Sequence, residues 1–301
     1  MDAIREKWLK MLGTPSYEIG NGEMTFEKAY EYEDYTVEMY IQKNGPQKSQ
    51  RVSMAIPKNK AFPCPAVVVP FYYREAMLGF NPETNEKIDR FCDYPIMTDL
   101  AKRGYITISA DAFYRNYEPE NYTGEGFSQW KIAAEALKRD NPEWTGMSKL
   151  ITDTQLLVNA LIKDKRADSE KIGIMGHSLG GKMSFYTACL DDRIKVMVAS
   201  DFGFGWEQTN WTDIWYLGDK VSLLKDMKMD HTELLGTVYP KPFCLIAGEF
   251  DNQESIDMIY KAKGYDNDKS TLKMINHQTG HKPPKDALEA AYDFLDKYLK
   301  N

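Results

Sequence analysis

The residue best placed to do chemistry is Ser178, which lies in the run Gly-His-Ser-Leu-Gly-Gly. An apolar stretch suited to a buried strand precedes it at residues 171–175, and a helical run follows at residues 182–190. A serine at such a strand-to-helix corner presents its hydroxyl above the sheet, and Gly176 and Gly180 let the backbone cross closely there. The pattern predicts a nucleophilic serine.

A serine hydroxyl needs a base to remove its proton, and histidine is the usual one. Of the four histidines, His177 lies inside the serine turn and is expected to point elsewhere, and His231 has no strand end to fix it. His277 and His281 both follow the last predicted strand. We prefer His281, because it directly precedes Lys-Pro-Pro and a closing helix; His277 is the alternative.

A carboxylate must hold that base and support its positive charge. The apolar strand at residues 241–247 is followed by Gly-Glu-Phe-Asp-Asn, so Asp251 is the predicted acid and Glu249 the alternative. Asp251 also lies just before a helix, where capping the helix is the structural explanation for it. The predicted triad is Ser178, Asp251 and His281.

Negative charge that develops on a substrate oxygen needs donors already in place. The backbone N–H of Leu179, directly after the nucleophile, is predicted to be one of them. The second is expected from the loop after the strand at residues 65–70, from the backbone of Phe71 or Tyr72. Their bulk is expected to narrow the acyl side of the pocket.

The elements that must position these groups alternate between strand and helix, which predicts an α/β fold with a mostly parallel sheet flanked by helices. A hairpin around Asn-Gly-Pro at residues 44–46 is expected to add an antiparallel edge. We interpret residues 1–301 as a single domain. Residues 1–25 form a helical extension, and aromatic-rich excursions at 112–146 and 201–239 cover the site at the carboxyl ends of the strands.

Composition excludes several classes of function. A net charge of −7 and a pI near 5.3 argue against a nucleic-acid partner. No apolar run is long enough to span a membrane, and the first residues lack a signal-peptide core, so we expect a cytoplasmic protein without a membrane partner. The scattered cysteines, which lack metal-site spacing, are interpreted as reduced core thiols: Cys64, Cys92, Cys189 and Cys244.

The order Ser, Asp, His along the chain, together with the serine turn, resembles the α/β-hydrolase superfamily from Tyr30 to Leu299. Within it, the Gly-His-Ser-Leu-Gly-Gly-Lys run, the segment at residues 141–147 and the Gly-His pair at residues 280–281 are similar to the dienelactone hydrolase and acetyl xylan esterase-like group. Dienelactone hydrolases use cysteine as the nucleophile, so the serine favours the esterase side. The sequence departs from many relatives in having Pro-Phe-Tyr-Tyr at residues 70–73, where they have His-Gly.

This resemblance implies a serine carboxylic ester hydrolase with an acyl-serine intermediate and neither metal nor cofactor. Its substrate would be a small-molecule or carbohydrate ester, such as an acetylated sugar. Trp206, Trp211 and Tyr114 are candidates for contacting that substrate, although packing in the core is the alternative for the tryptophans. A serine exopeptidase and a noncatalytic binding protein of the same fold are the competing functions.

Overall fold

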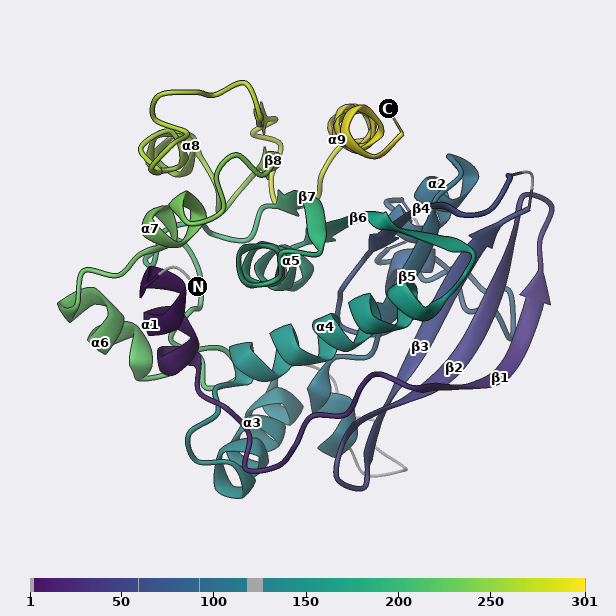
Figure 1. The fold of residues 1–301 in the computed structure, drawn as a ribbon, viewed down its shortest axis with the longest axis horizontal. Helices are drawn as coiled ribbons and strands as arrows, with labels where there is room; N and C mark the ends of the chain where they lie inside the picture. The colour runs from purple at the N-terminus through teal and green to yellow at the C-terminus, as the bar shows by residue number, and fades with distance from the viewer. Residues whose placement is uncertain (1–2, 59, 92, 118–126, 301) are drawn as a thin grey trace.

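A nine-stranded sheet forms the centre of the computed structural model, which describes residues 3–58, 60–91, 93–117 and 127–300 (Figure 1). Its order is β1-β2-β3-β5-β4-β6-β7-β8-β9. The pairs β1–β2, β2–β3 and β3–β5 are antiparallel, and all the pairs from β5 to β9 are parallel. The predicted α/β fold with a mostly parallel sheet is confirmed. The strands are β1 (Met24–Glu31), β2 (Tyr35–Gly45), β3 (Lys48–Pro57), β4 (Cys64–Val68), β5 (Ile106–Ala110), β6 (Ala167–His177), β7 (Ile194–Ser200), β8 (Phe243–Ala247) and β9 (Leu272–Asn276).

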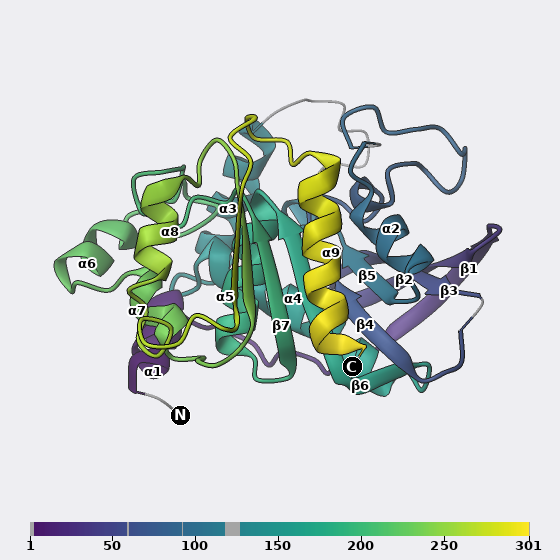
Figure 2. The ribbon, with the colours of Figure 1, turned by 90° about the horizontal axis from the view of Figure 1, so that it is seen from above.

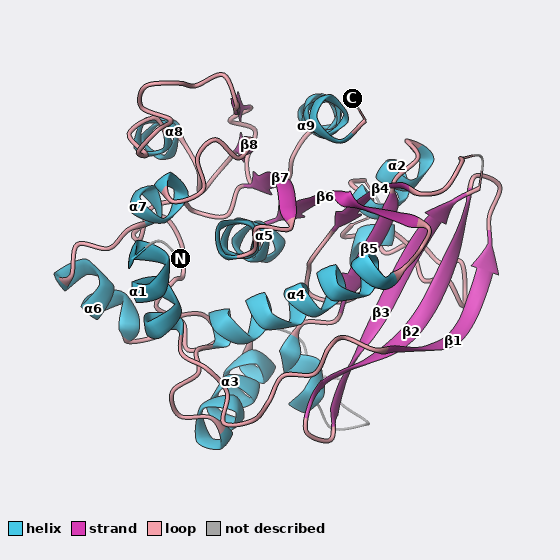
Figure 3. Cartoon of the chain, in the orientation of Figure 1, coloured by secondary structure: helices cyan, strands magenta, loops and turns pink. Residues whose placement is uncertain are grey.

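Helices cover both faces of the sheet (Figures 2 and 3), with α2 and α9 on one side and α4 and α5 on the other. The helices are α1 (Ala3–Leu12), α2 (Ile96–Lys102), α3 (Ser128–Asp140), α4 (Gly146–Lys163), α5 (Leu179–Leu190), α6 (Lys220–Asp226), α7 (His231–Gly236), α8 (Gln253–Ile259) and α9 (Lys285–Leu299), with short 3-10 turns η1 (Ala76–Leu78) and η2 (Phe113–Tyr117). None of the helices in the described ranges is long and apolar enough to cross a membrane.

Alternating side chains of the central strands build a separate core on each face. On β7, Val196 and Val198 pack toward α9, whereas Met197 and Ala199 pack toward α5. Every residue of α5 is buried, because this helix lies between the sheet and the outer helices. The serine at the start of α5 is therefore attached to the most deeply packed helix of the fold.

The antiparallel edge differs in detail from the prediction. β2 and β3 form the hairpin expected around residues 44–46, but a further strand, β1, precedes them and is separated from β2 by residues 32–34. β1 was not predicted because most of its side chains are exposed and because Lys28 interrupts the apolar alternation of Met24, Phe26 and Tyr30. The remaining differences lie in the excursions, where α3, α6 and α7 were not predicted.

Three of the four cysteines can be compared with their prediction. Cys64, Cys189 and Cys244 are buried free thiols, as expected for core cysteines. Burial raises the pKa of the Cys189 and Cys244 thiols to about 12, so both are neutral and unreactive at ordinary pH. Cys92 lies outside the described residues.

Candidate active site

The turn between β6 and α5 has the sharp geometry that the sequence indicated. Ser178 has φ 55° and ψ −116°, a combination that side-chain-bearing residues rarely adopt. A Cβ atom at Gly176 would lie 2.1 Å from the carbonyl oxygen of Gly180, and one at Gly180 would lie 2.1 Å from that of Pro70. Only glycine fits at both positions. The close approach of the backbones at this turn places Ser178 in the wall of a cavity.

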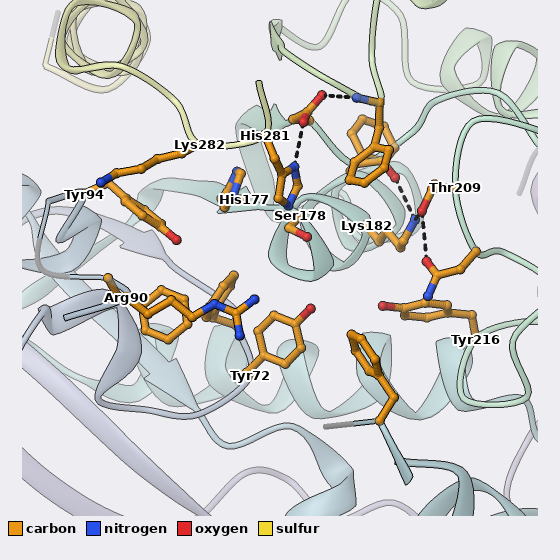
Figure 4. Close-up of a pocket in the computed structure, with 17 residues that line it drawn as sticks. Tyr72, Arg90, Tyr94, His177, Ser178, Lys182, Thr209, Tyr216, His281 and Lys282 are labelled. Carbon is orange, nitrogen blue, oxygen red and sulfur yellow. Dashed lines mark hydrogen bonds and ion pairs between the residues drawn. The ribbon is translucent and has the colours of Figure 1, made fainter. Parts of the chain in front are cut away.

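An imidazole lies beside this serine. His281 is in the loop between β9 and α9, and Figure 4 shows its ring next to Ser178. His177 lies 4.5 Å from the His281 ring and Phe250 lies 4.8 Å from it, both measured between ring centroids. Packing from both sides restricts the orientation of the His281 imidazole.

The carboxylate that contacts His281 is Asp201, which the sequence analysis did not select. Nδ1 of His281 donates to Oδ2 of Asp201 at 2.6 Å, and the Asp201 side chain is fully buried. Asp201 directly follows β7, and its positive φ of 43° turns the chain out of the strand. Serine, imidazole and carboxylate therefore come from the ends of three different strands.

Backbone donors fix the Asp201 carboxylate. Oδ1 accepts the N–H groups of Gly248, Phe250 and Asp251, and Oδ2 accepts that of Glu249, at distances of 2.9–3.1 Å. Burial alone would raise the pKa of Asp201, but the bonds from His281 and from the backbone outweigh it and hold the pKa below its ordinary value. Asp201 is thus ionised and ready to support a positive charge on His281.

Asp251, the predicted acid, does not contact His281. Its carboxylate accepts the N–H groups of Phe202, Gly203 and Phe204 at 2.6–3.0 Å and the hydroxyl of Ser255 at 2.9 Å. The placement of Asp251 in the triad is therefore corrected: this residue is four positions past the end of β8, and its side chain turns back to hold the segment after Asp201. The alternative acid, Glu249, has an exposed side chain and contributes only its backbone N–H.

The other three histidines have distinct surroundings. His277 bonds through Nδ1 with Thr279 rather than with Asp201. His177 was expected to point away, but its buried ring lines the cavity, with Nδ1 3.1 Å from the hydroxyl of Ser200. Burial, with a smaller effect from His281, lowers the pKa of His177 to about 3, so it stays neutral. His231 is fully buried between the Tyr186 hydroxyl and a backbone carbonyl.

The loop after β4 approaches Ser178 from the side opposite to His281, as the position of Tyr72 in Figure 4 shows. Phe71 and Tyr72 line the cavity, and the first N–H groups of α5, beginning with Leu179, have no partner within their own helix. Burial raises the pKa of Tyr72, while hydrogen bonding with the Ser178 side chain and the charge of Arg90 act against that rise. The Tyr72 hydroxyl is therefore a neutral donor close to the nucleophile.

Contacts at both ends hold this loop in place. The carbonyl of Tyr72 accepts the N–H of Ala112 and the hydroxyl of Tyr114, both at 3.1 Å. The N–H of Arg74 donates to Asp111 at 2.9 Å, and Asp111 also accepts the Arg51 guanidinium at 2.6 Å. Tyr114 was a candidate for contacting substrate, but it supports the loop and is not among the described residues that line the cavity.

The two tryptophan candidates also lie in the core rather than at the cavity wall. Trp211 is fully buried and donates to the carbonyl of Gly203 at 2.8 Å. Trp206 donates to the carbonyl of Met229 at 3.2 Å and packs 4.1 Å from the His231 ring. The packing alternative is therefore the better description of both, because neither belongs to the described cavity lining.

The cavity has a volume of about 530 Å³ and a mixed wall. The sequence analysis missed several of its residues, since nothing in their spacing connects them to Ser178. Residues from both aromatic-rich excursions contribute, and Figure 4 shows how the side chains converge. The described lining consists of Phe71, Tyr72, Arg90, Phe91, Tyr94, Phe127, His177, Ser178, Lys182, Asp201, Phe202, Thr209, Asn210, Tyr216, Phe250, His281 and Lys282.

Comparison with known proteins supports the same fold. Residues 51–211 match the model of the dienelactone hydrolase family, and residues 135–301 match that of the prolyl oligopeptidase family. The Bacillus subtilis (strain 168) protein YtaP, named as a hydrolase, is 28% identical over 142 residues. The match covers 47% of this chain and 44% of YtaP, so the chain aligns with less than half of that relative.

Solved structures resemble the chain over most of its length. A Bacteroides fragilis NCTC 9343 protein named as an acetyl xylan esterase has a TM-score of 0.73 and 18% identity, covering 93% of this chain and 75% of its own. A glucuronoyl esterase from Solibacter usitatus has a TM-score of 0.69 and 12% identity, covering 97% and 90%. At these identities, the likeness establishes the arrangement of the elements.

Proposed function

Because the chain belongs to the dienelactone hydrolase family of the α/β-hydrolase superfamily, we propose that it is a serine carboxylic ester hydrolase. The hydrogen bond between His281 and the buried Asp201, beside the strained Ser178, is the observation that carries the proposal. A serine, an imidazole and an ionised carboxylate in this arrangement can catalyse acyl transfer. The catalytic roles are assigned to Ser178, His281 and Asp201.

The proposed reaction has two halves. His281 accepts the Ser178 proton as Oγ attacks the ester carbonyl, and it then gives that proton to the departing alcohol, leaving an acyl-serine. A water molecule next loses a proton to His281 and attacks the acyl carbon; His281 then gives that proton to Oγ of Ser178 as the bond to the acyl group breaks, which releases the acid and restores the serine. Asp201 stays ionised throughout and stabilises the imidazolium that forms in each half.

Two donors are proposed to bind the oxygen that becomes negative. One is the backbone N–H of Leu179 at the start of α5, where the helix dipole also favours negative charge. The loop after β4 supplies the other, through the backbone of Phe71 or Tyr72. The Tyr72 hydroxyl, which lines the same cavity, is a further donor on that side.

We further propose that the substrate is a small-molecule or carbohydrate ester, and that removal of acetyl groups from a sugar is one candidate reaction. The cavity volume falls within the range of sites that hold ligands of that size. The names of the structural relatives, acetyl xylan esterase and glucuronoyl esterase, support the carbohydrate part of the proposal.

The test is turnover of p-nitrophenyl acetate by the purified protein and by Ser178→Ala. We expect hydrolysis by the protein and a loss of at least about 10³-fold in the variant, because the nucleophile is gone. Labelling of the protein by a fluorophosphonate probe, absent in Ser178→Ala, is the second readout. Equal rates for protein and variant, or no labelling of Ser178, would instead favour a noncatalytic binding protein.

The match of residues 135–301 to the prolyl oligopeptidase family favours serine exopeptidase activity as a second candidate. The same three residues would perform that reaction on an amide. A panel of dipeptide p-nitroanilides and the matching p-nitrophenyl esters separates the two functions. Amide turnover comparable to ester turnover would favour the peptidase.

A further inference from the structure

A second hollow lies beside the catalytic cavity and takes no part in the chemistry described above. Its volume is about 350 Å³, and its walls come from the turn between β1 and β2, the connection between η1 and α2, and α2 itself. None of its described lining residues also lines the catalytic cavity. We call this hollow the side groove; the lining side chains that matter here are Tyr32, Tyr35, Phe80, Asn85, Lys87 and Lys102.

The rings of Tyr32, Tyr35 and Phe80 line the side groove together. Tyr32 stacks on Tyr35 with ring centroids 5.2 Å apart, and Phe80 meets Tyr32 edge-on at 5.1 Å. Tyr35 is buried, whereas Tyr32 and Phe80 remain partly exposed. Because these rings hold one another in place, they offer an apolar surface to a ligand without rearrangement.

The polar side chains of the side groove offer hydrogen-bond donors. The Tyr32 hydroxyl donates to Oδ1 of Asn85 at 3.1 Å, which leaves the Asn85 Nδ2 group without a partner among the described residues. Lys87 and Lys102 are exposed, and neither ammonium has an ion-pair or hydrogen-bond partner within the part of the chain that the structure describes. The described groove lining contains no carboxylate. This set of donors suits a ligand that is rich in acceptor oxygens.

Backbone pairing holds the wall between Phe80 and Lys87 in shape. These two residues form an isolated antiparallel bridge. Beside it, the N–H of Ile88 donates to the carbonyl of Gly79 at 3.0 Å. The side groove is therefore formed before any ligand arrives, and binding does not require this wall to become ordered.

The side groove and the catalytic cavity share the connection between η1 and α2. Tyr94 lines the cavity, whereas Lys87 and Pro95, on the same connection, line the side groove. Tyr94 and Pro95 are consecutive residues, so their Cα atoms are only about 3.8 Å apart. Figure 2 shows this connection, in blue, at the same end of the sheet as the loop that leads into α9. A long ligand with one end at Ser178 can therefore continue over the connection into the side groove.

We propose that the side groove is a second carbohydrate-binding site, which holds sugar units of the substrate that lie beyond the scissile ester. A pyranose ring has an apolar face of C–H groups that packs on aromatic rings, and hydroxyl oxygens at its edge that accept hydrogen bonds. Tyr32 and Phe80 supply the rings, and Asn85, Lys87 and Lys102 supply the donors. This proposal rests on the ester hydrolysis proposed above, and it adds a site that is separate from the acyl-transfer groups.

The turnover experiment changes the length of the sugar chain and keeps the scissile ester. The substrates are a hexasaccharide and a disaccharide that carry one acetyl group on the same terminal unit, prepared in β-linked xylose, glucose and mannose series. The readout is the ratio of kcat/KM for the hexasaccharide ester to that for the disaccharide ester. Because the ratio is taken within each protein, general damage to the catalytic site cancels. We expect a ratio above one in at least one series, since only the longer chain reaches the side groove.

Removal of an aromatic ring from the side groove should reduce this ratio. Phe80→Ala and Tyr32→Ala are each expected to lower it by about 2- to 10-fold, as for the loss of one aromatic contact. Phe26→Ala is the matched control, because Phe26 is 55% exposed and meets the Tyr40 ring edge-on at 5.6 Å but lies outside the described groove lining. Ratios at or below one in every series, or equal ratios in Phe80→Ala and Phe26→Ala, would overturn the assignment of the side groove.

Binding provides a readout that does not depend on turnover. Calorimetric titration of the unacetylated hexasaccharides into Ser178→Ala should show binding in at least one series, weakened about 2- to 10-fold by adding Phe80→Ala. Lys87→Gln combined with Lys102→Gln removes both charges but keeps N–H donors, so it should weaken binding by less than about tenfold. A larger loss in this lysine variant, with no loss in Phe80→Ala, would assign the side groove to an anion and overturn the carbohydrate site.

The two experiments separate this inference from the proposed reaction. Hexasaccharide binding that Phe80→Ala weakens, without ester turnover by the unmodified protein, would keep the side groove and overturn the reaction. Turnover of p-nitrophenyl acetate without hexasaccharide binding in any series would overturn the side groove and leave the reaction standing.

Discussion

Asp201 and Asp251 are two fully buried aspartates at the ends of neighbouring strands, and they differ in what faces their carboxylates. Both accept several backbone N–H groups, and each holds the loop that contains or follows the other. Asp201 also meets an imidazole, whereas Asp251 meets the hydroxyl of Ser255. The fold thus uses one carboxylate to orient His281 and the other to hold the segment that follows the first.

Their ionisation reflects this difference. Burial raises the pKa of Asp251 despite its four hydrogen bonds. In Asp201 the hydrogen bond with His281 and those from the backbone overcome the cost of burial and lower the pKa. A partner that can take a positive charge separates the carboxylate proposed to act in catalysis from the structural one.

The largest expected effect comes from Asp201→Asn. The amide cannot support an imidazolium and disfavours the required His281 tautomer, so kcat/KM for p-nitrophenyl acetate should fall by about 10³- to 10⁴-fold. Circular dichroism and urea unfolding of the same preparation establish that the variant is folded. Activity within tenfold of the unmodified protein would assign the acid to another residue.

The next effect is on stability, and it belongs to Asp251→Asn. This change keeps one acceptor oxygen but replaces the other with an NH₂ group, which cannot accept from the three N–H donors and the hydroxyl that Asp251 receives, so unfolding should be easier by about 2–4 kcal/mol. Because Asp251 does not contact His281, kcat/KM for p-nitrophenyl acetate should stay within about tenfold of the value for the unmodified protein. A loss of activity as large as that of Asp201→Asn would break the distinction between the two carboxylates.

The pH dependence of stability should separate them again. Asp201, with its lowered pKa, contributes stability that is present above about pH 4 and is lost as the pH falls further. Asp251, with its raised pKa, contributes stability that is present below about pH 4 and is lost as the pH rises through its folded-state pKa. Urea unfolding at a series of pH values gives the free energy of unfolding of each variant and of the unmodified protein. The difference between the two isolates the contribution of the substituted carboxylate.

In that measurement the destabilisation by Asp201→Asn should shrink below about pH 4, and that by Asp251→Asn should shrink as the pH rises above it. Subtracting the unmodified protein removes the contributions of buried neutral histidines such as His177 and His231, whose pKa values are lowered to about 3. Differences that are flat with pH would mean that neither carboxylate is coupled to folding through its proton.

The sequence could predict a site residue where its role depends on its neighbours in the chain, but not where that role depends on contacts with distant segments. The serine turn was recognisable because Gly176 and Gly180 are required within the turn itself, and His281 because it lies between a strand and a helix. The acid was not recognisable, because Asp201 and Asp251 both follow apolar strands. The pairing of β7 with β8 brings both loops together, and only the three-dimensional path decides which carboxylate faces the imidazole.

The same reasoning explains the misplaced aromatic residues. Tyr114, Trp206 and Trp211 lie in excursions next to the site, but each also packs against a distant segment, at Tyr72, Trp8 and Tyr186 respectively. Trp206, for example, stacks on Trp8 of α1, near the start of the chain. Arg90 was missed for the opposite reason, since an arginine in a polar connection carries no pattern that links it to Ser178.

The smallest expected effect is that of Ser255→Ala, which tests how much of the stabilising role of Asp251 depends on its side-chain partner. The hydroxyl lies 2.9 Å from both Asp251 and Gln208, and its single proton can serve only one of them at a time. Its removal should therefore cost about 1 kcal/mol in urea unfolding and leave kcat/KM unchanged, because the backbone N–H donors of residues 202–204 remain. Asp251→Asn combined with Ser255→Ala should then be less destabilising than the sum of the two single changes, because both remove the same contact. Additive effects would show that Ser255 acts through its contacts with Gln208 and with the Asn252 N–H instead, and that the backbone alone fixes the Asp251 carboxylate.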